Sequence, residues 1–340
     1  MFWGDIALNH PELITSVPKE MIVANWTYGA RDDFDARIKP FKDAGLDQLV
    51  CPGVHSWNQI FPAHDLTVKN VVNFVRDGQE AGALGMLNTE WDDDGEALFE
   101  ATWYGIVLGA AASWQQGELD LAAFERDFDW AFFRADGDTF VRSIRTLGGV
   151  NTTLGVGTSD PLFWQEPFTG AFQEQARKSK EKAQKMRAAV EGVEETLRRD
   201  GARARRNRTM IPAMILAARR FDHLGRRMLV VEQFSRDYWQ AYLTLGDRQR
   251  VGRLRRYHGA IYNSLREMAE ELSLLREEYR RQWLAENRPY WLDSILARYD
   301  QSIQTWLAKS RAVEEAMREY NQKSTLPNPE EFGLGARPQP

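Results

Sequence analysis

The chain is poor in cysteine and lacks long apolar runs. Cys51 is the only cysteine among the 340 residues, which excludes an internal disulfide and a metal centre built from several cysteines. No apolar run is long enough to cross a bilayer, so we expect no membrane-embedded segment. No secretory segment opens the sequence, which is typical of a cytoplasmic protein. A segment upstream of Met1 could still hold a signal peptide, so the compartment stays open.

Basic residues are scarce in the first half. Residues 1–168 hold 11 Lys and Arg against 26 Asp and Glu, a net charge of −15, whereas the remainder holds 33 and 23, a net of +10. Eight of the twelve tryptophans also lie in the acidic part. Indole rings stack on the apolar faces of sugars, and carboxylates accept hydrogen bonds from sugar hydroxyls. We therefore expect two regions of different character, the first suited to carbohydrate.

Strand and helix patterns alternate along the first 113 residues. Short apolar runs predict strands at 1–6, 21–26, 48–51 and 83–88, and helical periodicity predicts helices at 34–44, 68–80 and 96–113. Four strand–helix units of this length indicate a parallel sheet in an α/β fold.

Aromatic and polar side chains follow each predicted strand. They are Trp3 and Asp5, Trp26 and Tyr28, His55, Trp57 and Asn58, and finally Glu90, Trp91 and Asp93. The carboxyl ends of parallel strands meet at one edge of a sheet, where ligands bind. The pattern therefore predicts one shared pocket.

The run Asp92, Asp93 and Asp94 allows three interpretations. Acidic residues favour helix N-termini, so these could cap the following helix. Glu90 and Trp91 add more than a cap needs, which favours a ligand site. A divalent-cation site with His55 is the third interpretation, but successive carboxylates point in different directions. We expect neither a metal nor a cofactor.

The remainder of the chain is predicted to be helical. Residues 121–133 should form a helix, 148–158 a loop and 172–199 one charged helix. Apolar residues keep helical spacing over 211–241, 254–279 and 292–306, which indicates long amphipathic helices in an antiparallel bundle. Residues 324–340 hold four prolines and few apolar anchors, so we expect a disordered tail. The predicted domains are a barrel-like part at 1–135, a connection at 136–168, a helical bundle at 169–323 and the tail.

Arginines cluster between the predicted helices at 198–208. No aromatic residues are interleaved with them, so we interpret the run as a solvated polar turn. We expect no nucleic-acid partner.

Several segments taken together resemble a known enzyme family. They are Trp3-Gly-Asp5, His10-Pro-Glu-Leu13, Trp26-Thr-Tyr28, Pro52-Gly-Val-His-Ser-Trp-Asn58, Asn88-Thr-Glu-Trp-Asp-Asp-Asp-Gly95, Tyr104-Gly105 and Ala110-Ala-Ala-Ser-Trp114. Over about residues 1–135 this set resembles the second half of the catalytic barrel of glycoside hydrolase family 20, the β-N-acetylhexosaminidases. The helical remainder resembles the C-terminal helical extension that some members carry.

The resemblance implies a TIM-type (β/α)8 barrel, of which this chain supplies about four β/α units, followed by an all-α antiparallel bundle of long helices. Family members remove terminal N-acetylhexosamine with retention: the N-acetyl oxygen attacks the anomeric carbon, an Asp holds the amide, and an adjacent Glu protonates the leaving oxygen. That Asp-Glu pair belongs to the fourth strand of the barrel. The chain begins at what would be the fifth, so we expect the pair upstream of Met1 and no useful activity from the 340 residues alone.

The resemblance also implies roles for individual residues. Trp3, Trp26 and Trp91 would form the walls of the sugar pocket. Asp93 would grip distal hydroxyls, with Glu90 as its rival, and Tyr28 would steady the reacting N-acetyl group. The rim would consist of Asp5, His55, Trp57 and Asn58.

The expected partner is a glycan that contains N-acetylhexosamine. The alternative is a non-catalytic carbohydrate-binding or scaffold protein made of a half barrel and a helical bundle. A half barrel leaves two open strand edges, so either form could pair into a homodimer that closes the barrel.

Overall fold

The computed structural model describes residues 1–337, which form two compact units. The first unit contains Met1–Thr152 and Glu195–Met214, and the second contains Thr153–Glu194 and the residues from Ile215 onward. The division therefore falls at Thr152, between the boundaries at 135 and 168 expected from the sequence. The chain also returns to the first unit for 20 residues, which no composition change signals.

A four-stranded parallel sheet forms the centre of the first unit. Its strands are β1 (Phe2–Trp3), β2 (Val23–Trp26), β3 (Gln48–Cys51) and β4 (Gly85–Met86), and they pair in sequence order. The register places Trp26 beside Cys51 and Trp3 beside Ala24. Sequential parallel order requires a crossover after every strand, and the segments α2 (Asp35–Asp43) and α3 (His64–Ala81) provide two of them.

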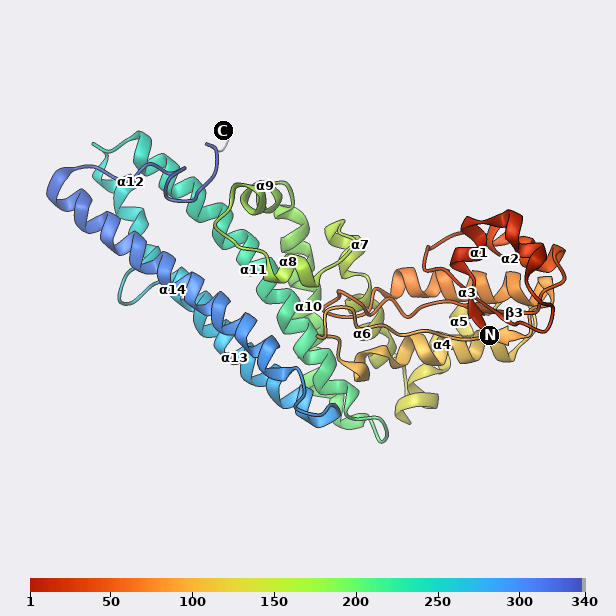
Figure 1. Cartoon of the computed structure of the whole chain (residues 1–340). Coiled ribbons are helices and arrows are strands. Elements are labelled where there is room, and N and C mark those ends of the chain that lie inside the picture. Colours follow the sequence, from red (N-terminus) through yellow and green to blue (C-terminus); the bar gives the residue numbers. More distant parts are fainter. Residues whose placement is uncertain (338–340) are drawn as a thin grey trace. The chain divides into compact units, whose positions relative to one another are not determined.

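Apolar burial holds this sheet to its helices. Val23 of β2 and Phe41 of α2 are fully buried, together with Leu46 in the turn that leads into β3. Helix α3 packs against β3, β4 and α4 (Trp103–Trp114), and ends at Gly82, whose φ of +79° suits glycine. Figure 1 shows α3 and α4 running side by side.

The first unit departs from the predicted elements in several places, among them the strand expected at 83–88, which is only Gly85–Met86. The strand expected at 1–6 ends at Trp3, because α1 (Asp5–Asn9) begins there and the 3-10 turn Pro11–Ser16 follows. The helix expected from Glu96 begins as a 3-10 turn at Phe99–Thr102 before α4. The loop expected at 148–158 contains a short helix, α7 (Val150–Leu154), which directly follows α6 (Thr139–Gly148). The helix expected at 121–133 is present as α5 (Leu121–Phe128) and a π-turn at Asp129–Phe133.

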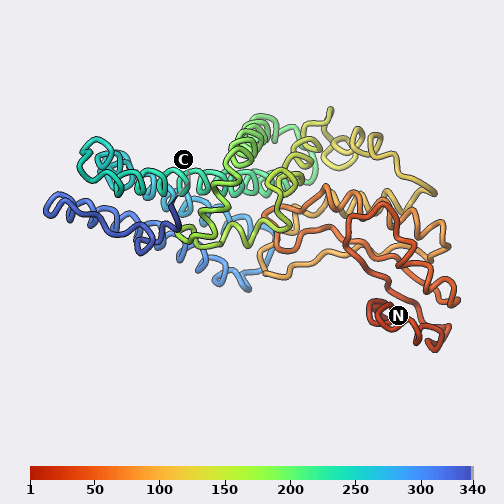
Figure 2. The backbone as a smooth tube through the Cα atoms, turned by 90° about the horizontal axis from the view of Figure 1, so that it is seen from above, coloured from red at the N-terminus to blue at the C-terminus, as the bar shows by residue number. Residues whose placement is uncertain are grey.

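Long helices dominate the rest of the chain (Figures 1 and 2). The long helices are α10 (Lys180–Asp200), α11 (Met210–Leu243), α13 (Ser264–Glu286) and α14 (Leu292–Lys323). Shorter helices are α8 (Asp160–Trp164), α9 (Gly170–Lys178) and α12 (Arg248–Gly252), and 3-10 turns lie at Gly201–Arg203 and Arg253–Tyr257. The single helix expected at 172–199 is two helices that break at Ser179. Helices α13 and α14 pack along their length as an antiparallel pair. Within residues 1–337, no helix combines the length and apolar character that a membrane crossing requires.

The segment after α14 is packed, contrary to the expected disordered tail. Leu326 and Leu334 are buried, and Phe332 stacks on Tyr238 with ring centroids 4.7 Å apart. Four backbone carbonyls of this segment accept side-chain hydrogen bonds. The donors are Tyr238 to Pro327, Lys309 to Phe332, Gln173 to Gly333 and Ser235 to Leu334. A few apolar residues are therefore enough to hold this segment in place, because the helices form a pocket for each of them. Residues 338–340 lie outside the described chain.

Candidate functional site

Side chains from the ends of all four strands line one cavity in the first unit. Its volume is about 370 Å³, and its lining residues are Trp3, Asp5, Trp26, Tyr28, Trp57, Trp91 and Asp93. All seven belong to the ten residues expected from the sequence. A cavity of this size accommodates one sugar ring, and its lining combines indole faces with two carboxylates.

The strand geometry explains why these residues meet. β1 ends at Trp3 and β2 ends at Trp26, so both indoles stand at the same edge of the sheet. Beyond β3 and β4, an isolated parallel bridge joins Gly53 to Thr89, which carries the pairing to within two residues of Trp91. The parallel register therefore sets the spacing of the aromatic side chains.

Gly53 leaves room for two of the rings. A Cβ at this position would lie 2.8 Å from Cδ1 of Tyr28 and 3.0 Å from Cη2 of Trp57. These rings pack against each other with centroids 4.8 Å apart. A glycine at position 53 therefore lets these two lining rings pack closely against the backbone, a role that the sequence did not indicate.

The Tyr28 hydroxyl is held by hydrogen bonds at the cavity. It accepts one from Nε1 of Trp91 at 2.6 Å and lies 3.3 Å from Oγ1 of Thr89. The Thr89 hydroxyl donates its hydrogen bond to the carbonyl of Pro52 at 2.8 Å. The Tyr28 hydroxyl can therefore donate a hydrogen bond to Oγ1 of Thr89 or to an acceptor on a ligand. Burial raises the pKa of Tyr28, which keeps this proton in place at neutral pH.

The two cavity carboxylates have different surroundings. Asp5 accepts a hydrogen bond from Nε1 of Trp26 at 3.2 Å, which fixes the Trp26 ring. The backbone carbonyl of Trp26 in turn accepts from the guanidinium of Arg37 at 2.7 Å. Among residues 1–337, no donor forms a hydrogen bond with Asp93. Its two oxygens are therefore free to accept hydrogen bonds from hydroxyls.

The three other expected residues do not line the cavity. His55 is buried, with Nδ1 2.9 Å from the carbonyl of Gly53 and Nε2 2.7 Å from the carbonyl of Tyr28, and its ring stacks on Trp57. Burial lowers the pKa of His55, although the two carbonyls oppose this. His55 thus lies behind the residues that line the cavity, where its ring contacts the backbone carbonyls of both Tyr28 and Gly53. Glu90 is half-buried, and burial raises its pKa. Asn58 adopts a φ of +56° in the connecting loop.

The three successive aspartates divide their roles. Oδ1 of Asp92 accepts from the backbone amides of Glu96 and Ala97 at 2.9 and 3.0 Å, and Asp94 accepts from Glu96 at 3.2 Å. Partial burial raises the pKa of Asp92 to about 6. Asp92 and Asp94 therefore bind backbone amides of the loop that precedes the 3-10 turn and do not cap a helix, contrary to the capping interpretation, while Asp93 lines the cavity.

The cation interpretation finds no geometry to support it. Both ring nitrogens of His55 already contact carbonyls, and Asp92 and Asp94 are bound to backbone amides. No group of three His, Cys, Asp or Glu side chains in the described part of the chain could hold a metal ion.

The arginine run at 198–208 makes contacts within its own unit. Arg203 donates to the carbonyl of Asp136, Asn207 donates to that of Phe132, and the backbone amide of Arg205 donates to Phe133. Arg199 pairs with Asp200. Part of the run therefore anchors the returning segment to the π-turn, a use that the sequence did not indicate.

Comparison of the sequence with models of known protein families and with curated proteins finds no match. The candidate functional site is thus the cavity at the strand ends, which is lined by four indoles, one phenol and two carboxylates.

Proposed function

We propose that the first unit binds a terminal N-acetylhexosamine as the second half of a β-N-acetylhexosaminidase barrel of glycoside hydrolase family 20. The observation that carries the proposal is the convergence of seven of the ten expected residues on one cavity. The sequential parallel order of β1 to β4 supports it, since neighbouring barrel strands follow one another in this way.

The cavity offers each contact that such a sugar needs. Indoles stack on the apolar face of a pyranose, and Asp93 accepts hydrogen bonds from its distal hydroxyls. The Tyr28 hydroxyl, oriented by Trp91, donates to the N-acetyl oxygen and holds it towards the anomeric carbon. These groups bind and position the sugar, and none of them is placed to protonate a leaving group.

The catalytic pair of the proposed mechanism is an Asp followed directly by a Glu, and the 340 residues contain no such dipeptide. We infer that another polypeptide segment supplies it. Without a general acid, turnover falls by roughly 10²–10⁴-fold, and losing the amide-holding Asp as well lowers it further.

Sugar binding tests the pocket. We expect N-acetylglucosamine to quench the tryptophan fluorescence of the purified chain, and glucose to do so at higher concentration, since it lacks the acetamido group. Trp91→Ala should weaken N-acetylglucosamine binding by about tenfold, the order expected for one lost aromatic contact. The matched control is Trp114→Ala, because Trp114 is 93% exposed and does not line the cavity. Equal loss in both variants would contradict the assignment.

Turnover tests the missing pair. A nitrophenyl N-acetylglucosaminide should not be hydrolysed measurably by the 340-residue chain, but should be hydrolysed by a version extended through the upstream reading frame. Hydrolysis by the shorter chain would show that the acid lies within these residues. Sugar binding with no hydrolysis by either version would favour the second candidate, a non-catalytic carbohydrate-binding or scaffold protein.

The second candidate rests on the cavity being formed by these strands alone. In either case we propose that the open edges of β1 and β4 pair with another chain segment or with a second copy. The edges are only two residues long, which weakens self-pairing. Light scattering of the purified chain distinguishes a homodimer from a monomer.

A further inference from the structure

A second cavity lies inside the helical unit. Its volume is about 290 Å³, and α8, the turn after it, α11, α13 and α14 all border it. The walls include Trp164 and the buried Trp306, while Arg227 and His223 contribute charge and hydrogen-bonding capacity. None of the sugar-pocket residues belongs to this unit.

Arg227 is a buried cation without a carboxylate partner. It is 4% exposed, it donates to the backbone carbonyls of Leu162 and Phe163, and its guanidinium lies 4.5 Å from the Phe172 ring centroid. Its Nε has no hydrogen-bond partner, and no ion pair reaches it from residues 1–337. Burial lowers the pKa of Arg227 to about 9, and the charge of Glu166, which lines the same cavity without forming an ion pair with Arg227, acts against this. A buried charge with no ion-pair partner is costly, so this guanidinium favours a bound anion.

Arg220, about two turns earlier on α11, has a carboxylate partner. Arg220 donates to Oδ1 of Asp160 at 2.8 Å, and both side chains are 2% exposed. The same helix therefore buries one arginine with its counter-ion and another without it. The difference marks Arg227 as the residue that awaits a ligand.

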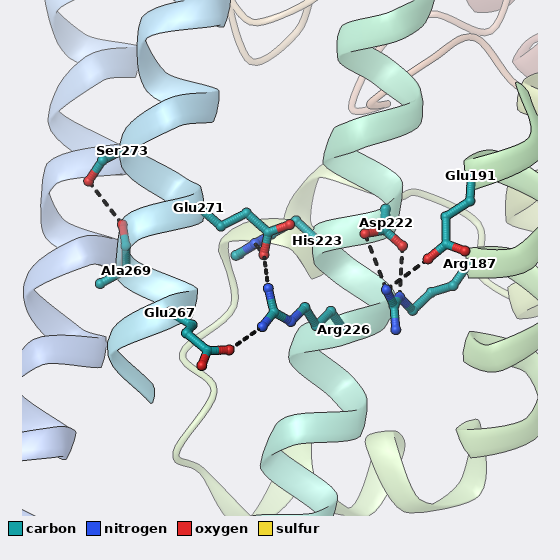
Figure 3. Close-up of polar contacts among 9 residues, drawn as sticks. All are labelled: Arg187, Glu191, Asp222, His223, Arg226, Glu267, Ala269, Glu271 and Ser273. Atoms are coloured by element: carbon teal, nitrogen blue, oxygen red, sulfur yellow. Dashed lines mark hydrogen bonds and ion pairs between the residues drawn. The ribbon is translucent and has the colours of Figure 1, made fainter. Parts of the chain in front are cut away.

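His223 presents a defined ring nitrogen to the same cavity. Its Nδ1 lies 3.0 Å from Oε2 of Glu271, which also contacts Arg226, and Arg226 binds Glu267 as well (Figure 3). Burial raises the pKa of Glu271, but the His223 contact and the Arg226 charge outweigh it, so the pKa is lowered and the carboxylate stays ionised. Burial lowers the pKa of His223, which makes the ring neutral at pH 7. The proton then sits on Nδ1, and Nε2 is left as an acceptor.

The two groups together define the ligand. Arg227 offers donors to one negative charge, and Nε2 of His223 accepts from a hydroxyl. Trp164 offers an apolar wall for a carbon skeleton. A simple anion leaves the acceptor nitrogen unused, and a neutral sugar leaves the guanidinium uncompensated. We propose that this cavity binds a small hydroxycarboxylate, such as a sugar acid, with its carboxylate on Arg227 and a hydroxyl on His223.

Calorimetry at pH 7 on the full chain tests the proposal with sodium glucuronate as the probe. Glucuronate should bind at least tenfold more tightly than glucose, which lacks the charge, and than acetate, which lacks the hydroxyls. Arg227→Gln should lower glucuronate affinity about tenfold to 100-fold, and Arg227→Lys should restore part of it. Arg236→Gln, on the same helix but outside the cavity, is the control and should leave the affinity unchanged.

A second variant keeps the test valid if Arg227→Gln fails to fold. Thr305→Trp places a bulky ring in the cavity from α14, and should abolish glucuronate binding while leaving the sugar pocket of the first unit unaffected. Equal binding of acetate and glucuronate would overturn the hydroxyl assignment, and tighter binding of inorganic phosphate would overturn the carboxylate. No heat from glucuronate at millimolar concentration would overturn the proposal as a whole. These outcomes are independent of N-acetylglucosamine binding, so failure here leaves the proposed function standing.

Discussion

The two cavities are built on opposite principles. The cavity of the first unit is open and aromatic, and of its two carboxylates Asp5 is half-buried and Asp93 is exposed to solvent. The cavity of the helical unit is lined by a buried, charged arginine and a buried, neutral histidine. Exposed aromatic rings remain solvated when no ligand is bound, whereas a buried charge without a partner lowers the stability of the fold. The stability of the helical unit therefore depends more strongly on each of its ion pairs.

The largest effect is expected from a substitution that breaks a buried ion pair in the helical unit. Asp160→Asn leaves Arg220 buried without its counter-ion, and should lower the free energy of unfolding by about 3–5 kcal/mol. Urea denaturation followed by circular dichroism measures this. Arg276→Gln removes a pair with Asp300 whose carboxylate is more than half exposed, and should cost less than about 1 kcal/mol. Similar losses in both variants would contradict the contrast between buried and exposed pairs.

An intermediate effect concerns acid stability in the first unit. His64 is fully buried between Phe61 and Tyr104, and neither ring nitrogen has a hydrogen-bond partner among residues 1–337. Burial lowers the pKa of His64 to about 3, below the usual value of 6.5. The unfolded chain therefore binds the proton first, and stability is lost as the pH falls below about 6.5.

Between pH 7 and pH 4 this single histidine should account for about 3 kcal/mol of lost stability. His64→Phe keeps a ring at the site and removes the titration. The measurement is the free energy of unfolding at both pH values, in the native chain and in the variant. If the two proteins lose the same amount on acidification, the neutral buried histidine is not the cause.

The smallest expected effect is steric and lies at the cavity of the first unit. Gly53→Ala brings a methyl group against Tyr28 and Trp57, and should cost about 1–3 kcal/mol while weakening N-acetylglucosamine binding. Gly85→Ala is the control, because the nearest atom to its Cβ is 3.6 Å away. Binding retained by Gly53→Ala would show that the two rings can shift without harm.

Much of the first site was predictable from the sequence, because strand ends carry a strong pattern. An aromatic and a polar residue follow each of four apolar runs, and parallel strands bring such residues to one edge. Sequence spacing could not predict the position of every side chain. It could not show that His55 points away from the cavity, because this depends on hydrogen bonds to the backbone of Gly53 and Tyr28.

The second site was beyond sequence reasoning for a different reason. His223 and Arg227 lie four residues apart on one helix, and such spacing is common among charged helical residues. These two residues become a candidate site only through Glu271, which contacts His223 from α13, and Trp306, which lines the same cavity from α14. The packing of segment 324–337 was missed similarly, because its two buried leucines contribute little to the composition of the segment.

That segment has a consequence for how the protein is made. Phe332, Gly333 and Leu334 contact α14, α9 and α11 respectively, and all three helices precede them in the chain. The helices therefore leave the ribosome with part of their apolar surface still uncovered. The helical unit can reach its final packing only when these late residues have emerged, so its folding is completed after synthesis of the helices rather than during it.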